Sequence, residues 1–171
     1  MQAIAKKRYI FISGMFIFLL LDGSLSYNFS KWMFTATSSM ESRLLLLWLI
    51  LALCYLDYDK ILWWAFVAGI FYDLYYSGIL GIFTFLFPLM VYLNRETFNF
   101  FSPTFMLVFS IYLIDVTLLT TLSYWINSLI GLANVSATDF IARTLGPTLA
   151  YNMFFFVVLY VPLRKLFEKF A

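Results

Sequence analysis

Three aspartates lie in otherwise apolar stretches of this sequence, and carboxyl groups in such positions could take part in catalysis, carry protons or ions, or form buried hydrogen bonds. Asp22, Asp73 and Asp115 lie among Leu, Ile, Phe and Val, where a charged side chain costs roughly 2.5–3.5 kcal/mol at the centre of a membrane helix. Two aspartates that share a proton can catalyse hydrolysis, as in aspartyl proteases. A set of carboxyl groups can also carry protons or ions. Alternatively, hydrogen-bonded carboxyl groups can hold helices together or meet a partner's polar group in the bilayer.

The rest of the sequence favours this last, structural role for the aspartates, with a proton or ion path as an alternative. The Gly-x-Gly-Asp element of the presenilin and prepilin-peptidase type is absent, as is the Asn-x-x-Asp-Arg type signature of lipoprotein signal peptidases. Histidine, the commonest general base and metal ligand, is absent as well. The single cysteine, Cys54, lies in an apolar run and is expected to be a small buried hydrophobe. We therefore predict no enzyme, no cofactor and no metal site.

The composition indicates an integral membrane protein. Of the 171 residues, 64% are hydrophobic and only 12% are charged, whereas a soluble domain averages about 25% charged residues. So few charged residues could not cover the surface of a soluble protein of this size. The net charge of +2 gives no indication of nucleic-acid binding. The length suits one domain, residues 1–171, without a sizeable part outside the membrane.

Six apolar runs predict the elements that position the aspartates. Each membrane-spanning helix needs about 20 residues, so the fold class expected is all-α, a bundle of six transmembrane helices. The first run follows Lys6, Lys7 and Arg8 and resembles a signal peptide, but it is long enough to be a retained span. The second run is short for a span. The expected spans are residues 9–29, 40–56, 61–77, 79–93, 104–131 and 143–163.

The distribution of basic residues predicts the orientation. With six spans both termini share one side, which then holds eight Lys and Arg residues. The other side holds three, Lys31, Arg43 and Arg143. Because positive residues favour the cytoplasm, both termini are expected there, in a multi-pass protein of the bacterial cytoplasmic membrane.

Four polar residues are expected to share one layer of this bundle. Counting about 1.5 Å per residue along each span brings Asp22, Asp73, Asp115 and Asn152 to a similar depth. These residues come from the first, third, fifth and sixth spans. The expected intramembrane polar layer lies slightly outside the midplane.

Small residues form a second pattern around Asp73. Ala65, Gly69 and Asp73 are spaced by four and therefore share one helix face. Gly78 and Gly81 follow at the turn into the fourth span. Such a stripe lets helix backbones approach closely, so we expect these five residues to serve either partner binding or helix packing within the chain.

The residues around this stripe resemble the MreD family of rod shape-determining proteins. Gly69-Ile70-Phe71-Tyr72-Asp73-Leu74, followed by Gly78 and Leu80-Gly81, is similar to the central signature of that family. The last span adds Arg143-Thr144-Leu145, Pro147-Thr148-Leu149, Asn152 and Tyr160-Val161-Pro162-Leu163. The length and the short loops are also similar.

The resemblance implies a non-enzymatic scaffold subunit of the bacterial cell-elongation complex, the elongasome, acting in cell shape and peptidoglycan synthesis. The implied partners are the bitopic membrane protein MreC, the MreB filament, the RodA polymerase and its penicillin-binding transpeptidase. The alternative is the substrate-binding subunit of an energy-coupling-factor vitamin transporter, also a six-helix protein of similar size. Against it, the first span lacks the Ala-x-x-x-Ala stripe that such subunits use for docking.

The end of the chain is basic and amphipathic. Arg164, Lys165 and Lys169 alternate there with Leu and Phe. Basic segments next to a span are attracted to anionic lipid. We expect this cytoplasmic tail to lie on the bilayer or to contact the filament.

Overall fold

The computed structural model describes residues 2–35, 37–56, 58–132 and 136–170, with side chains from residue 6. Within these residues the fold is all-helical, as predicted, apart from one isolated bridge between Phe34 and Ser39. The helices are α1 (Gln2–Asn28), α2 (Ser30–Met33), α3 (Leu44–Tyr55), α4 (Ile61–Tyr72), α5 (Ile82–Phe100), α6 (Phe105–Leu129), α7 (Ala137–Phe140) and α8 (Gly146–Phe170), with π-helical turns η1 (Asp73–Ser77) and η2 (Ile141–Leu145).

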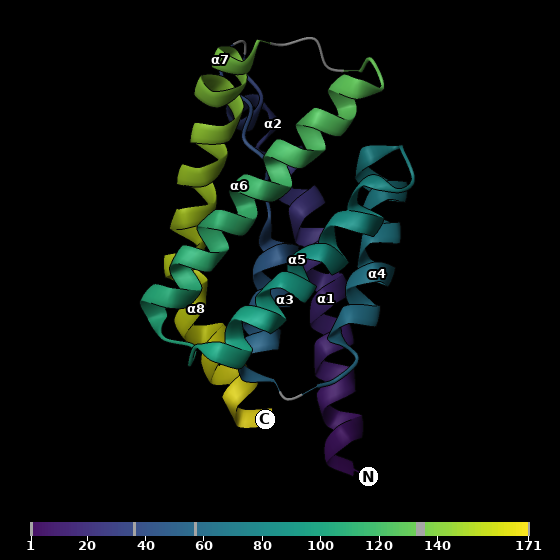
Figure 1. The fold of residues 1–171 in the computed structure, drawn as a ribbon, viewed down its shortest axis with the longest axis vertical. Coiled ribbons are helices and arrows are strands. Elements are labelled where there is room, and N and C mark those ends of the chain that lie inside the picture. Colours follow the sequence, from purple (N-terminus) through teal and green to yellow (C-terminus); the bar gives the residue numbers. More distant parts are fainter. Residues whose placement is uncertain (1, 36, 57, 133–135, 171) are drawn as a thin grey trace.

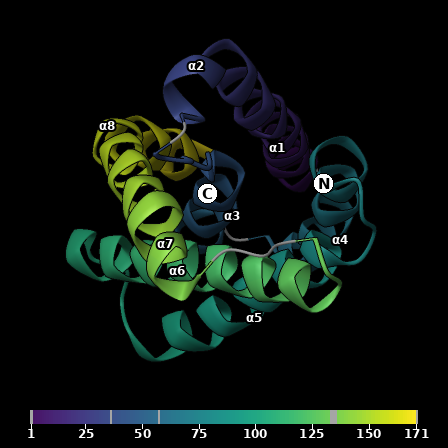
Figure 2. The same cartoon turned by 90° about the horizontal axis from the view of Figure 1, so that it is seen from above.

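Helix α3 forms the centre of the bundle. Its residues from Leu44 to Ala52 are all buried, as expected for a helix that is hydrophobic all round. It contacts α1, α4, α5, α6 and α8, which surround it in the view from above (Figure 2). The indole of Trp48 on α3 stacks on Phe18 of α1 at 5.0 Å and donates a hydrogen bond to the Phe11 carbonyl.

The chain reaches α3 through an extended segment rather than a helix. After α2, residues 34–35 and 37–43 return toward the centre of the bundle, and α3 begins at Leu44 instead of at residue 40 as expected. Within this segment the Ser39 amide donates to the Arg143 carbonyl at 2.6 Å and the Met40 amide donates to the Met33 carbonyl at 2.8 Å. The helix has 12 residues, about 18 Å of length, so α3 by itself is shorter than a bilayer core of about 30 Å.

Helices α4 and α5 form a closely packed hairpin. α4 continues through η1 to Ser77, and α5 begins at Ile82 rather than at residue 79 as expected. α5 then continues to Phe100, beyond the expected end at residue 93, and within it Asn94 is buried against α6 and donates a hydrogen bond to Asp115. The expected loop at Asn94 is therefore helical.

Helices α6 and α8 are the long helices of the second half. α6 crosses the bundle obliquely and α8 returns beside it, so that both chain termini lie at the same end (Figure 1). Among the described residues, three helical segments are long and apolar enough to cross a membrane: Lys6–Asn28, Phe105–Leu129 and Ala137–Phe170. The last joins α7, η2 and α8. These helices and the composition together indicate a membrane protein.

Candidate functional site

The carboxylate of Asp73 caps the start of α5. It is fully buried and accepts hydrogen bonds from the amides of Gly81 at 2.9 Å, Phe83 at 2.9 Å and Thr84 at 3.0 Å. The Thr84 hydroxyl donates a fourth bond at 2.8 Å. The first amides of a helix have no partner within the helix, and an anion there also interacts favourably with the helix dipole. Asp73 therefore holds the end of α4 to the beginning of α5.

The glycines around Asp73 are explained by the same hairpin. A Cβ on Gly69 would lie 2.4 Å from the Phe83 carbonyl oxygen, so only glycine lets the two helix backbones approach this closely. Gly78 and Gly81 have positive φ angles of 70° and 117°, which side chains other than glycine rarely adopt. Gly69 thus lies in the contact between α4 and α5, Ala65 is buried one turn before it, and Gly78 and Gly81 belong to the exposed turn that joins the two helices.

Asp22 on α1 caps the start of α3 in the same way. Its Oδ1 accepts from the Leu44 amide at 2.8 Å and from the Ser42 hydroxyl at 2.6 Å, and its Oδ2 accepts from the Leu45 amide at 3.0 Å. The side chain is 2% exposed. Without water in a bilayer core, a helix that begins inside the bundle needs such partners for its amides. Asp22 thus fixes the point at which the extended segment becomes a helix.

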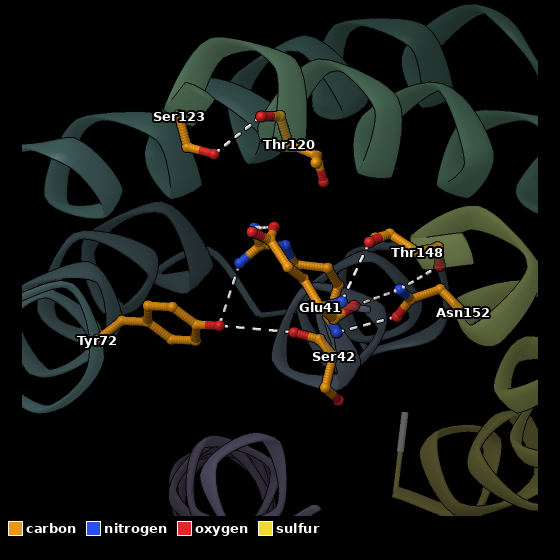
Figure 3. Close-up of polar contacts among 8 residues, drawn as sticks. Glu41, Ser42, Tyr72, Thr120, Ser123, Thr148 and Asn152 are labelled. Atoms are coloured by element: carbon orange, nitrogen blue, oxygen red, sulfur yellow. Dashed lines mark hydrogen bonds and ion pairs between the residues drawn. The ribbon is translucent and has the colours of Figure 1, made fainter. Parts of the chain in front are cut away.

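Asn152 on α8 binds the same segment (Figure 3). Its Oδ1 accepts from the Arg43 amide at 2.9 Å, and its Nδ2 donates to the carbonyls of Glu41 and Thr148, both at 2.8 Å. The Tyr112 hydroxyl of α6 lies 3.1 Å from the same Oδ1. Asn152 is fully buried, and the amide uses both its donor and its acceptor.

Arg43 is a candidate functional residue that the sequence analysis does not single out. It is counted there with the basic residues of the outer side, at the start of the expected span 40–56, whereas the structure buries it at the start of α3, 3% exposed. Its Nη1 donates to the Tyr72 hydroxyl at 3.1 Å, its Nη2 forms an ion pair with Glu41, and its guanidinium lies over the Phe83 ring. The shortness of the apolar run from residue 44 to 56 is the signal that could have found it, because the chain must enter the bundle before that helix begins.

The four residues of the expected polar layer belong to three separate arrangements. Asp22 and Asn152 meet at the start of α3, whereas Asp73 caps α5. Asp115 is bound by the amide nitrogen of Asn94 on α5. The hydroxyl of Tyr72, which precedes Asp73 in the sequence, accepts a hydrogen bond from Arg43 at the start of α3.

A polar cavity of about 380 Å³ lies against these caps. Its walls include Asp22, Arg43 and Tyr72, together with Ser123 and Asn127 of α6. Among the described residues no group of three or more His, Cys, Asp or Glu side chains gathers to hold a metal ion. The oxygens of Asp22 and Asp73 already accept several hydrogen bonds, so the geometry supports a structural role for both carboxylates rather than proton transfer to a substrate.

The basic tail continues α8 at the end of the bundle where both termini lie (Figure 1). Arg164 forms an exposed ion pair with Glu168 at 2.7 Å, and its guanidinium lies over the Tyr55 ring at 5.4 Å. Lys165 and Lys169 are exposed. The three cations thus lie on the surface beside the chain termini.

Comparison with known proteins decides the family. The family described as rod shape-determining protein MreD matches residues 6–170. The chain belongs to the MreD family. It is 27% identical over 128 residues to the rod shape-determining protein MreD of Bacillus subtilis (strain 168), covering 75% of this chain and 74% of that protein. None of the solved structures matches the chain.

Membership of the MreD family supports a role in determining rod shape. It favours the scaffold hypothesis over the vitamin-binding alternative. The signature residues that carried the resemblance, Gly69, Asp73, Gly78 and Gly81, all lie in the hairpin of α4 and α5, where each has the physical role described above.

Proposed function

We propose that this chain is a non-enzymatic, six-pass scaffold of the cell-elongation complex in the bacterial cytoplasmic membrane. The observation that carries the proposal is the use of Asp22, Asp73 and Asn152 to cap helices in a chain of the MreD family. The common position of the termini (Figure 1) supports an even number of crossings. With Arg43 buried in the bundle, eight basic residues stand against Lys31 and Arg143, which supports cytoplasmic termini.

The partner we propose is an MreC-like bitopic protein, whose single span binds a groove on the outside of α4 and α5. This groove has a volume of about 420 Å³ and is lined by Phe66, Phe85 and Tyr92 among others. Gly81 and Thr84, which bind the Asp73 carboxylate, also line it. The stripe of small residues therefore acts on the partner by shaping this hairpin. The MreB filament, RodA and a penicillin-binding transpeptidase belong to the same proposed complex.

Capture of MreC from detergent extracts tests the groove. Replacing Phe66 and Phe85 by alanine removes two side chains that are 38% and 63% exposed, without touching the buried core. Ile114→Ala with Met153→Ala is the matched control, because these residues line a similar apolar groove between α6 and α8. We expect the first pair to reduce MreC capture at equal protein levels and the second pair to leave it unchanged. Equal capture by both would refute the proposed position of the partner.

For the basic tail we propose contact with anionic lipid or with the MreB filament. Changing Arg164, Lys165 and Lys169 to glutamine removes the attraction of the tail to a negative surface. The test is co-sedimentation of MreB with proteoliposomes, with and without anionic lipid. We expect less MreB in the pellet with the triple variant. If sedimentation is unchanged in both lipids, the tail serves only to set topology.

A further inference from the structure

The walls of the polar cavity of about 380 Å³, here the Glu41 cavity, differ in accessibility. Asp22 and Arg43 line it but are buried, at 2% and 3% exposure. Phe34 and Tyr76 are 48% and 40% exposed, and the side chain of Glu41 is 34% exposed. A molecule that enters the cavity therefore meets the Glu41 carboxylate and two aromatic side chains, whereas the guanidinium of Arg43 is covered by protein.

The accessible charge in the Glu41 cavity is negative. Arg43 is the single cation among the described residues that line it, and in its ion pair with Glu41 the carboxylate is the exposed partner. Asp22 adds a second carboxylate to the lining, and the hydrogen bonds that it accepts leave its charge in place. Because a cleft lined by one sign of charge concentrates ions of the other sign, this cavity favours a positive group.

The surrounding groups favour an organic cation over a metal ion. Among the described residues no three His, Cys, Asp or Glu side chains gather as metal ligands, whereas Ca²⁺ takes about six to eight oxygen ligands. Aromatic rings attract ammonium and guanidinium groups, and one ring of this wall, Phe83, already lies under the guanidinium of Arg43 at 5.1 Å. The exposed Phe34 and Tyr76 offer such rings to a second cation, and the side-chain oxygen of Asn127 is an acceptor.

We propose that the Glu41 cavity binds a small organic cation, a primary ammonium or guanidinium group on a short apolar chain. The cation pairs with the carboxylate of Glu41, and its chain lies along Phe34 and Tyr76. The volume of the cavity lies within the range of small-molecule sites, about 300–1,000 Å³. Among the described residues, none lines both this cavity and the groove on the outside of α4 and α5. The site therefore does not depend on the proposed scaffold role.

Cysteine labelling tests the sign of the charge in the cavity. In a Cys54→Ala background, which removes the single native thiol, Ser26→Cys and Asn127→Cys place two half-buried reporters in the wall. Ser24→Cys and Ser128→Cys, exposed positions on the same two helices outside the wall, are the matched controls.

Each variant, purified in dodecylmaltoside, is labelled with a cationic and with an anionic methanethiosulfonate reagent at constant ionic strength. We expect the ratio of the cationic to the anionic labelling rate to be about tenfold higher at the two reporters than at the two controls, as in a cleft that concentrates counter-ions. A ratio at both reporters that is equal to or lower than that at the controls would overturn the proposal.

Protection from an uncharged maleimide then tests binding, with n-butylammonium as the probe. 1-Butanol and butyrate are its neutral and anionic counterparts. A site with a dissociation constant of about 1 mM, which is weak, slows labelling about tenfold at roughly 10 mM ligand. We expect butylammonium alone to slow labelling, at the reporters and not at the controls. Equal slowing by 1-butanol, slowing at the controls as well, or no slowing at either reporter would overturn the proposal.

The cation can be a free amine or the side chain of a lysine in a peptide, and N-acetyl-lysinamide distinguishes these sources. Its side chain ends in the same butylammonium group, and N-acetyl-norleucinamide is the neutral counterpart. Slowing by butylammonium alone assigns the site to a free amine. Slowing by both cations, and not by N-acetyl-norleucinamide, shows that a lysine side chain also fits.

Substitutions in the wall assign the protection to Glu41. Glu41→Gln removes the accessible carboxylate with little change of shape, and Glu41→Gln with Arg43→Gln removes both charges in case the unpaired arginine prevents folding. We expect both to lose the protection and the preference for the cationic reagent, and Phe34→Leu to weaken binding about threefold. Full protection in the folded Glu41 variants would overturn the proposal. MreC capture in these variants reports on the scaffold role separately, so the two proposals can fail independently.

Discussion

The cap that Asp73 provides to α5 is the most direct target for a stability test. Asn replaces the carboxylate with a group of nearly the same size, in which one oxygen becomes a nitrogen that only donates. If the remaining oxygen takes the place of Oδ2, the amide of Phe83 faces the new nitrogen. If it takes the place of Oδ1, the amides of Gly81 and Thr84 face it. Either orientation leaves one or two backbone donors buried without an acceptor.

The expected magnitude follows from this count. Each unsatisfied buried group costs about 1–3 kcal/mol, and the lost attraction between a carboxylate and the helix dipole adds about 0.3–2 kcal/mol. We expect Asp73→Asn to lower the free energy of unfolding by about 2–4 kcal/mol. Thr84→Val, which removes only the hydroxyl bond, should cost about 1 kcal/mol.

Equilibrium unfolding in mixed micelles of dodecylmaltoside and SDS, followed by tryptophan fluorescence, measures this difference. The control is Glu168→Gln, which breaks an ion pair whose two side chains are 46% and 47% exposed. Exposed ion pairs contribute about 0–1 kcal/mol, so this variant should unfold close to the wild type. If Asp73→Asn unfolds at the same SDS fraction as Glu168→Gln, the capping argument is refuted.

Three further predictions use the same assay. Gly69→Ala should lower the free energy of unfolding by about 1–3 kcal/mol, the usual cost of overpacking, because the new Cβ would lie 2.4 Å from the Phe83 carbonyl oxygen. Asn152→Leu should lower the free energy of unfolding by about 2–4 kcal/mol, because it leaves the Arg43 amide and the Glu41 carbonyl without their hydrogen-bond partner. Asn94→Leu should destabilise by removing the hydrogen-bond donor to Asp115, and the double variant Asn94→Leu with Asp115→Leu should recover most of the loss, since replacing both partners of a buried pair can be nearly neutral.

Each of these has an outcome that contradicts it. Gly146→Ala is the control for Gly69→Ala: a Cβ there would lie 3.3 Å from the nearest atom, and a similar loss in both would show that close helix approach is not the cause. For Asn152→Leu, a loss no larger than that of Glu168→Gln would contradict the prediction. For the buried pair, a double variant less stable than Asn94→Leu alone would contradict it.

The sequence indicated which polar residues form buried hydrogen bonds better than it indicated their partners. A polar group in an apolar run must find a hydrogen-bonding partner, so Asp22, Asp73 and Asn152 could be selected from their positions in the apolar runs. Their partners are mostly backbone amides, and for Asp22 and Asn152 these lie far away in the chain. Backbone amides have no residue-type signature, so only the packing of the helices shows which ones are reached. Counting depth along each span predicted a single polar layer. It could not show that Asp22 and Asn152 bind the start of α3, that Asp73 caps α5, and that Asp115 pairs separately with Asn94.

Arg43 and Asn94 show why the helix ends were harder to predict. Both stand at the edge of a polar stretch, which in an amphipathic pattern usually marks a loop. In this chain Asn94 lies within α5, bound to Asp115, and Arg43 lies within the bundle, bound to Glu41 and Tyr72. A polar residue can lie inside the membrane when a buried partner satisfies its hydrogen bonds. Loops predicted from polar residues alone are therefore too long.

One physical rule explains both aspartate caps. The same rule indicates that Asp22 and Asp73 have a structural role. Helix α3 begins in the bundle interior and α5 begins against Asp73 at the end of α4. The hydrogen bonds of the Leu44, Leu45 and Phe83 amides there are buried, so a protein acceptor has to satisfy these amides. In both cases a carboxylate from an earlier helical segment, α1 for α3 and η1 for α5, supplies the acceptors and a favourable charge. Because its lone pairs are then directed at backbone donors, such a carboxylate holds two helices in register. Substitution of Asp73 should accordingly reduce partner capture only as far as it loosens the α4 and α5 hairpin, and in proportion to the lost stability.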